Sequence, residues 1–276
     1  MDETKDNEIQ NTEEANIPEE ELELSHTDKL VGLFTEPAAM FEKTAKFPPK
    51  HKDWVIPVLI LIVFAILSNY LLMTNPLIKQ DIIEKQMTEI EKRLDAAVEA
   101  GTLTQEQADQ QLEQTRDFME NRMGAQMVIQ LVATVIIIFI IVFVVAGVFL
   151  LLSKALYKGE GNYASSLVAY GLPMYIGVFG IIVMIIISMA TDKMFEGVNL
   201  ANLLSADKKE FGGYLLGKVD LFSLWFHAII GISYAKMFKS SSVGKYVIMV
   251  FATWIIWDVV VYFLAQAVPM LQGFLR

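Results

Sequence analysis

The sequence predicts an all-α polytopic membrane protein with five transmembrane helices and an extracytoplasmic helical hairpin inserted between spans one and two. The longest apolar run is the first observation behind this fold class, because residues 123–153 hold 31 positions without Asp, Glu, Lys or Arg. As a helix this run is about 46 Å long, more than the ~30 Å hydrocarbon core of a bilayer. Four further apolar stretches are the second observation. Because a bilayer core holds no water to satisfy backbone polar groups, each stretch must be helical.

Residues 1–28 carry the whole net charge of the chain. They hold eleven acids and one Lys, whereas the remaining 248 residues hold 21 acids and 21 bases. A segment without aromatic residues and with few apolar ones buries too little surface to offset its ordering entropy, so we expect a disordered acidic tail. This tail is interpreted as a solvated extension, and the alternative is a docking segment for a basic partner.

The segment 29–53 is expected to lie at the cytoplasmic face of the membrane. Pro37 limits any helix there to two short pieces. Large apolar residues stand among lysines, a composition that suits an anionic leaflet: Leu30, Leu33, Phe34, Phe41 and Phe47. A plain linker is the alternative interpretation.

A membrane domain is expected over residues 54–268. Its five spans are predicted at about 54–73, 127–152, 163–190, 219–238 and 246–268. The fourth span has the shortest uncharged core, and the preceding FGGYLLG either extends it or lies along the interface. Pro173 is expected to kink the third span. No apolar run precedes Trp54, so the first span is expected to serve as the insertion signal.

Residues 77–122 form the only sizeable polar insert between spans and are patterned as a helical hairpin. Gly101 is suited to cap the first arm, and Thr104 with Gln107 forms a capping-box pattern that opens the second. The apolar stripes step by three and four: Ile83, Met87, Ile90, Leu94 and Ala97, then Ala108, Leu112, Thr115 and Met119. We expect the stripes to pack on each other; a stalk that pairs with another subunit is the alternative.

The distribution of lysines predicts how the protein is oriented in the membrane. They gather before the first span and in the second and fourth loops: Lys43, Lys46, Lys50, Lys52, Lys154, Lys158, Lys236, Lys239 and Lys245. The positive-inside rule then gives a cytoplasmic N-terminus and an extracytoplasmic C-terminus. The chain has no Cys, which is common in bacterial proteins, so the expected location is a bacterial cytoplasmic (inner) membrane.

Two ionisable residues, His227 and Asp258, interrupt the last two spans. A central Asp costs about 2.5–3.5 kcal/mol on insertion scales, so both need an explanation. Antiparallel packing about the turn near Ser242 brings them to similar depth. We interpret them as a candidate intramembrane polar pair that locks the two helices; a proton-relay or ion site, or two independent groups, are the alternatives.

Signatures of enzymes are missing from the sequence. It has no HExxH, Walker loop or Gly-rich dinucleotide motif, and no clustered metal ligands, so no catalytic residue, cofactor or metal is expected. The segment GISYA is one residue from a nucleophile-elbow pattern, but its Ser233 lies about 120° around the helix from His227. Small residues at this spacing ordinarily serve close helix contact.

Several segments together resemble the Yip (Ypt/Rab-interacting protein) family, specifically its bacterial branch. These are GLFTEPAAMFEKTAKFP with the following Trp54 and Pro57, the segment SSLVAYGLPMYIG, and DLFSLWFHAIIGISYA. Tyr170, Gly171 and Pro173 look like the family's signature at its third span. The resemblance covers residues 30–270 without the hairpin, and it implies a cytosolic N-terminus and five spans. The family's Asp-Leu-Tyr-Gly-Pro segment is absent, so GTPase binding is not carried over.

The function expected from these features is that of a non-enzymatic integral membrane protein of Yip type, with a membrane-organising or scaffold role. The alternative is a small-solute or ion transporter, or a subunit of one, that uses the His227 and Asp258 pair. The expected partners are the lipid bilayer, further copies of the chain or other membrane proteins. No nucleic-acid partner is expected.

Overall fold

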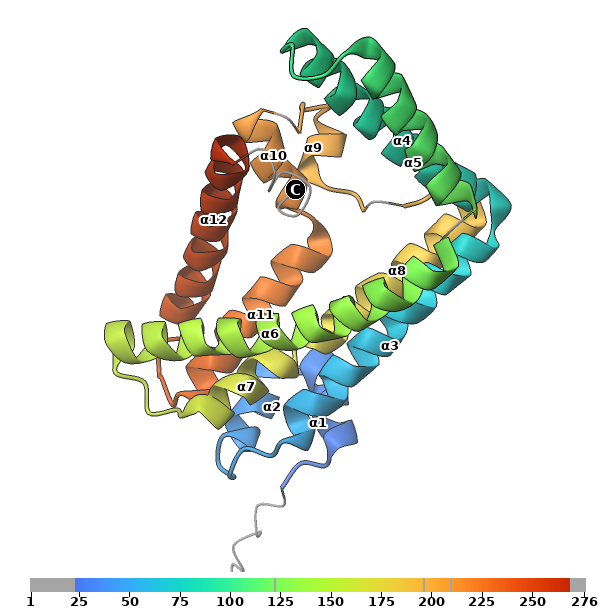
Figure 1. The fold of residues 1–276 in the computed structure, drawn as a ribbon. Coiled ribbons are helices and arrows are strands. Elements are labelled where there is room, and N and C mark those ends of the chain that lie inside the picture. Colours follow the sequence, from blue (N-terminus) through green and yellow to red (C-terminus); the bar gives the residue numbers. More distant parts are fainter. Residues whose placement is uncertain (1–22, 122, 196, 209, 269–276) are drawn as a thin grey trace, which may run out of the picture.

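The computed structural model describes residues 23–121, 123–195, 197–208 and 210–268 (Figure 1). The predicted acidic tail therefore lies largely outside the described residues. Within these ranges the regular elements are helices: α1 (His26–Thr35), α2 (Pro37–Thr44), α3 (Lys52–Thr74), α4 (Pro76–Glu99), α5 (Gln105–Asn121), α6 (Met123–Tyr157), α7 (Tyr163–Gly171), α8 (Met174–Thr191), α9 (Leu200–Leu203), α10 (Phe211–Lys218), α11 (Leu221–Met237) and α12 (Val243–Ala267). The predicted all-α class is confirmed.

Four helical stretches in the described part of the chain are long and apolar enough to cross a membrane. They are Lys52–Thr74, Val132–Tyr157, Tyr163–Thr191 and Val243–Ala267. The fourth predicted span corresponds to α11, a shorter apolar helix of 17 residues. The preceding FGGYLLG does not extend it, because these residues belong to the separate helix α10 and the chain leaves helical geometry at Val219.

Pro173 interrupts the third apolar stretch, as the sequence predicts. α7 ends at Gly171 and α8 begins at Met174. A proline offers no N–H to the preceding turn, and its ring crowds the carbonyl four residues back, so the helix breaks there. Both pieces contact α3 and α11, and α7 also packs against α6.

Helices α4 and α5 lie side by side at one end of the molecule (Figure 1). Gly101 ends α4 with a positive φ of 69°, and the N–H of Thr102 bonds to the carbonyl of Ala97. The capping box predicted for α5 is present: Thr104 Oγ1 accepts from the N–H of Gln107, whose side chain accepts from the N–H of Thr104. Both arms turn their stripes inward, with Met87 and Ala108 buried.

The α4–α5 pair does not continue the direction of α3. Asn75 has an extended ψ of 116° and caps α4, so the chain bends between α3 and α4 (Figure 1). Asn75 Nδ2 donates to Asp192 Oδ1 at 2.8 Å, and Asp81 Oδ2 accepts from the N–H of Met194 at 3.1 Å. These bonds tie the start of α4 to the loop that follows α8.

The N-terminal helices α1 and α2 are packed into the membrane bundle. Their boundary falls at Pro37, as predicted. Leu33, Met40 and Phe41 are buried in the main hydrophobic core, and α2 contacts α11. Phe34 lies edge-on to the rings of Phe179 and Trp225. The segment thus contributes to the main hydrophobic core, and its position at the cytoplasmic face of the membrane stays a prediction.

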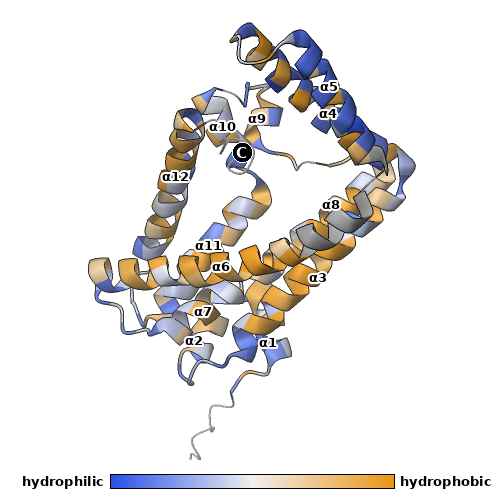
Figure 2. Ribbon diagram, in the orientation of Figure 1, coloured by the Kyte–Doolittle hydropathy of each residue, from blue (hydrophilic) through white to orange (hydrophobic). Residues whose placement is uncertain are grey.

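Hydropathy separates the helices into two groups (Figure 2). Apolar residues dominate α3, α6 and α8, whereas α4 and α5 are mainly hydrophilic with a narrow apolar stripe. Large apolar side chains on α6 and α12 remain exposed, among them Ile140, Leu151, Ile248 and Trp257. Such contiguous apolar exposure is typical of helices whose solvent is lipid.

Candidate functional site

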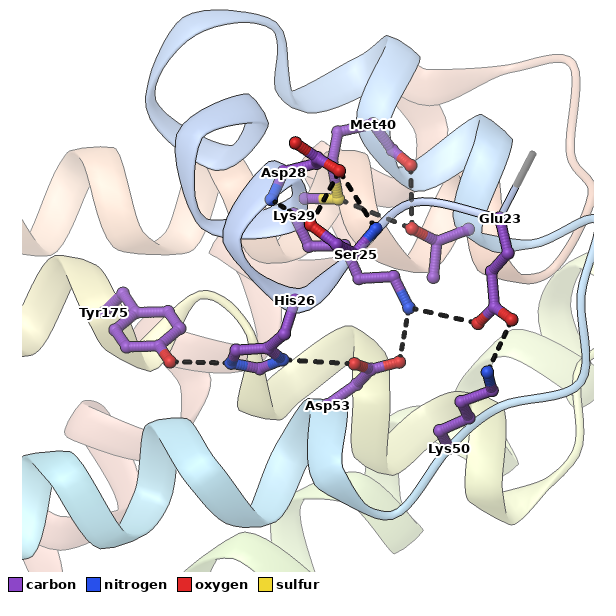
Figure 3. A network of polar contacts seen from close by, with 10 residues as sticks. Glu23, Ser25, His26, Asp28, Lys29, Met40, Lys50, Asp53 and Tyr175 are labelled. Carbon is purple, nitrogen blue, oxygen red and sulfur yellow. Dashed lines mark hydrogen bonds and ion pairs between the residues drawn. The ribbon is translucent and has the colours of Figure 1, made fainter.

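A buried ion pair lies where α3 enters the bundle (Figure 3). Lys29 of α1 places its Nζ 2.6 Å from Oδ2 of Asp53, which lies in the first turn of α3. The side chains are only 2% and 1% exposed. Because charged groups are rarely buried without a partner, this pair holds α1 to α3 in one arrangement.

His26 extends the contact to a third helix. Its Nδ1 lies 3.2 Å from Oδ1 of Asp53, and its Nε2 lies 2.8 Å from the hydroxyl of Tyr175 in α8. A carboxylate only accepts hydrogen bonds, so Nδ1 carries a proton and donates to Asp53. The Asp53 carboxylate is thereby held by two residues of α1, and the same imidazole bonds to α8.

The first turn of α1 explains why His26 and Lys29 point the same way. Ser25 Oγ accepts from the N–H of Asp28, and the Asp28 carboxylate accepts from the N–H of Ser25. This capping box fixes the start of the helix. His26 and Lys29 are then three residues apart in α1 and lie on one face.

Glu23 and Lys50 close the outer side of the network (Figure 3). Lys50 Nζ lies 2.5 Å from Glu23 Oε2, and Lys29 Nζ lies 3.8 Å from Glu23 Oε1. The hydrogen bond from Lys50 holds the pKa of Glu23 below its usual value, so this carboxyl is ionised at neutral pH. Two carboxylates thus face two ammonium groups, and their charges balance.

Serine and tyrosine hydroxyls join the helices deeper in the bundle. Ser166 Oγ donates to the carbonyl of Ala146 at 2.6 Å and lies 2.7 Å from the Tyr234 hydroxyl. Ser233 is fully buried, and its Oγ donates to the carbonyl of Ala169 at 2.6 Å. The serine of GISYA therefore ties α11 to α7, which is a structural role rather than that of an exposed nucleophile.

The three family-like residues, Tyr170, Gly171 and Pro173, have different positions. A Cβ atom on Gly171 would lie 2.5 Å from Cβ and 2.7 Å from Cα of Trp54, so only glycine allows α7 to approach α3 this closely. Pro173 produces the break between α7 and α8. Tyr170 is buried, and its ring contacts that of Phe226 in α11.

The predicted pair His227 and Asp258 lies on the adjacent helices α11 and α12. His227 Nδ1 donates to the carbonyl of Ser223 at 2.7 Å, and its ring stacks on Trp254 with centroids 4.2 Å apart. Asp258 is buried one helical turn after Trp254. Among the described residues no hydrogen bond or ion pair joins His227 to Asp258, so their coupling stays a prediction.

The network at Asp53 was not among the residues singled out from the sequence. In the sequence Lys50 indicates only the orientation, and Asp53 marks only the edge of the first apolar run. A usable signal was the acid placed directly before Trp54, since a charge at that boundary needs a partner. Its partners lie 24 and 27 residues earlier in the chain, a separation that no local pattern bridges.

Metal ligands do not cluster in the described part of the chain, where no group of three or more His, Cys, Asp or Glu side chains is placed to hold an ion.

Comparison with protein families matches residues 31–265 to the Yip1 domain. Neither the comparison with curated proteins nor that with solved structures gives a match. The matched range includes α2, runs through α11 and ends within α12, at residue 265. The chain is thus an integral membrane protein that belongs to the Yip1 domain family.

Proposed function

We propose that the protein is a non-enzymatic scaffold or membrane-organising factor of a bacterial cytoplasmic membrane. In this proposal α11 is the fourth of five spans, the N-terminus is cytoplasmic, and the C-terminus is extracytoplasmic. The α4–α5 hairpin then stands on the extracytoplasmic side. α1 and α2, which pack against the bundle of apolar helices, and the polar α4–α5 hairpin lie at opposite ends of the molecule (Figure 1).

Contacts between loops support this arrangement. The N–H of Glu160, after α6, bonds to the carbonyl of Phe238, after α11, so the second and fourth loops lie together. The first and third loops are also joined, through Asn75 and Asp192. Loops on the same side of a membrane must alternate in this way, and the lysine-rich set is the second and fourth.

The scaffold role is supported most by how the bundle uses its buried hydroxyls. Ser166, Ser233 and Tyr234 bond to atoms of neighbouring helices. A transport path needs polar groups that remain available to a solute, whereas these groups tie helices together. The bundle is therefore suited to hold α1–α2 and the α4–α5 hairpin in fixed positions.

Site-specific photo-crosslinking in cells tests this role. A photoreactive residue at exposed Glu91 or Glu113 of the hairpin, or at exposed Lys43 of α2, is expected to give discrete adducts with membrane proteins or with further copies of the chain. The same residue at Leu151, exposed on apolar α6, serves as the lipid-facing control. Solute flux in proteoliposomes, together with no discrete adduct from Glu91, Glu113 or Lys43, would favour the transporter alternative and refute the scaffold role.

A further inference from the structure

An apolar recess lies between the membrane-spanning helices. Its volume is about 230 Å³, and α3, α6, α7, α8 and α11 all contribute to its wall. Leu61, Ile138, Met174 and Phe226 are among the lining residues. Gly177 of α8 also lines it and leaves room where any larger side chain would project.

Tyr170 is the one residue with a polar side chain among the described residues that line the recess. The residue is only 8% exposed, and it lines the recess. The hydroxyls of Tyr163, Tyr175 and Tyr234 each have a hydrogen-bond partner in the protein. In the part of the chain that the structure describes, the Tyr170 hydroxyl has none. An unsatisfied hydroxyl in an apolar setting is costly, so a bound acceptor would be favoured there.

The recess lies among helices of the membrane domain, so the lipid around it determines which ligands can enter. Apolar cavities of about 150 Å³ stay free of water and bind hydrocarbon, and this recess is larger. Its walls are helices of the membrane domain, so the available hydrocarbon is the acyl chain of a lipid. Tyr170 lies about 10 Å along the helix from Tyr163, the first residue of α7. At that depth its hydroxyl can reach toward the ester groups that border the hydrocarbon core.

We propose that the recess binds one acyl chain of a diacyl glycerophospholipid and that the Tyr170 hydroxyl donates a hydrogen bond to the ester carbonyl of that chain. The apolar wall provides affinity for the chain, and the hydroxyl selects an ester-linked lipid. This site is independent of the scaffold role, because it requires only the membrane bundle.

Native mass spectrometry of the full-length protein tests the site. The probes are phosphatidylglycerol with ester-linked chains and its diether analogue, which has the same headgroup and chains but no carbonyl. The wild type is expected to retain the diester about five- to tenfold better, the effect of one net hydrogen bond. Tyr170→Phe should bind both lipids equally. Equal retention of the two lipids by the wild type would overturn the proposal, as would a diester preference that survives in Tyr170→Phe.

Two glycine variants test the recess itself. Gly177→Leu should fill it and weaken both lipids, because the new side chain displaces only the flexible end of Leu61, 3.3 Å from the added Cβ. Gly180→Leu, one turn further along α8, meets the ring of Phe222 at an ordinary 3.5 Å and is the matched control. Undiminished binding by Gly177→Leu would refute the location.

Stability and competition provide further readouts. Without lipid, Tyr170→Phe should melt no lower than the wild type, because it removes a hydroxyl that has no partner. Added diester lipid should then raise the melting temperature of the wild type more than that of the variant. Displacement of the diester by an equal concentration of a free fatty acid or an isoprenoid quinone would overturn the assignment to a diacyl lipid.

Discussion

Removing the charge of Asp53 is predicted to destabilise the protein strongly, although Asn has almost the same shape. Asp53→Asn leaves the Lys29 ammonium buried, with Glu23 at 3.8 Å as its remaining carboxylate neighbour. Lys29→Met is predicted to cost less. In that variant the Asp53 carboxylate keeps the hydrogen bond from His26 at 3.2 Å.

The structure sets the size of these effects. The Lys29–Asp53 pair is 2.6 Å long with both side chains almost fully buried, and breaking such a pair costs about 3–5 kcal/mol. The pair between Lys236 and Glu42 has a similar length of 2.5 Å but lies at the surface, where such contacts contribute about 0–1 kcal/mol. Lys236→Met is therefore the matched control. The double variant Lys29→Met/Asp53→Asn should recover most of the loss, since no unpaired charge remains in the buried pair.

Thermal melting in one detergent, followed by size-exclusion chromatography of the soluble fraction, measures all four variants. The expected order of melting temperature is Lys236→Met near the wild type, then the double variant, then Lys29→Met, with Asp53→Asn lowest. A melting temperature of Asp53→Asn equal to that of Lys236→Met would show that the buried charge pair does not stabilise the protein. Losses of the two single changes that simply add in the double variant would show the same, because neighbouring charges must couple.

Three further predictions follow from the topology and the predicted sites. A single Cys at Gln105 should react with an impermeant thiol reagent in intact cells and one at Ser241 should not; labelling of the latter would reject the five-span topology. The isolated segment 77–122 should give a helical circular-dichroism spectrum, and a coil spectrum at every concentration would count against the hairpin as an autonomous unit. His227→Leu and Asp258→Leu should each reduce the free energy of unfolding by about 1–3 kcal/mol and so lower the melting temperature. The two together should lose less than the sum, and strict additivity would show that these groups act independently.

Features encoded within a few residues were predicted well from the sequence. The break at Pro37, the interruption at Pro173 and the turn at Gly101 each depend on one residue with unusual backbone preferences. The capping box of Thr104 likewise needs only Gln107, three residues later. The bend at Asn75 was not predicted, because it is supported by Asp192 across the fold.

The polar network could not be found by the same means. Lysines outside apolar runs normally mark a cytoplasmic face, and Lys29 differs from Lys43 only in its tertiary surroundings. Its burial depends on where α1 lies against α3 and α8, which in turn depends on apolar contacts such as those of Leu33. Helical periodicity shows which face of α1 is apolar but not which helix covers it.

The buried contacts of α1 and α2 hold these two helices against the bundle. Release of these helices would expose Leu33 and Phe41 to water and leave the Asp53 carboxylate without Lys29 and His26. Each of these changes opposes release, because apolar surface and an unpaired buried charge are both costly. The family match also begins within α1, at residue 31. The two helices are therefore held firmly against the bundle, and a partner that binds them would meet a fixed surface rather than a flexible tether.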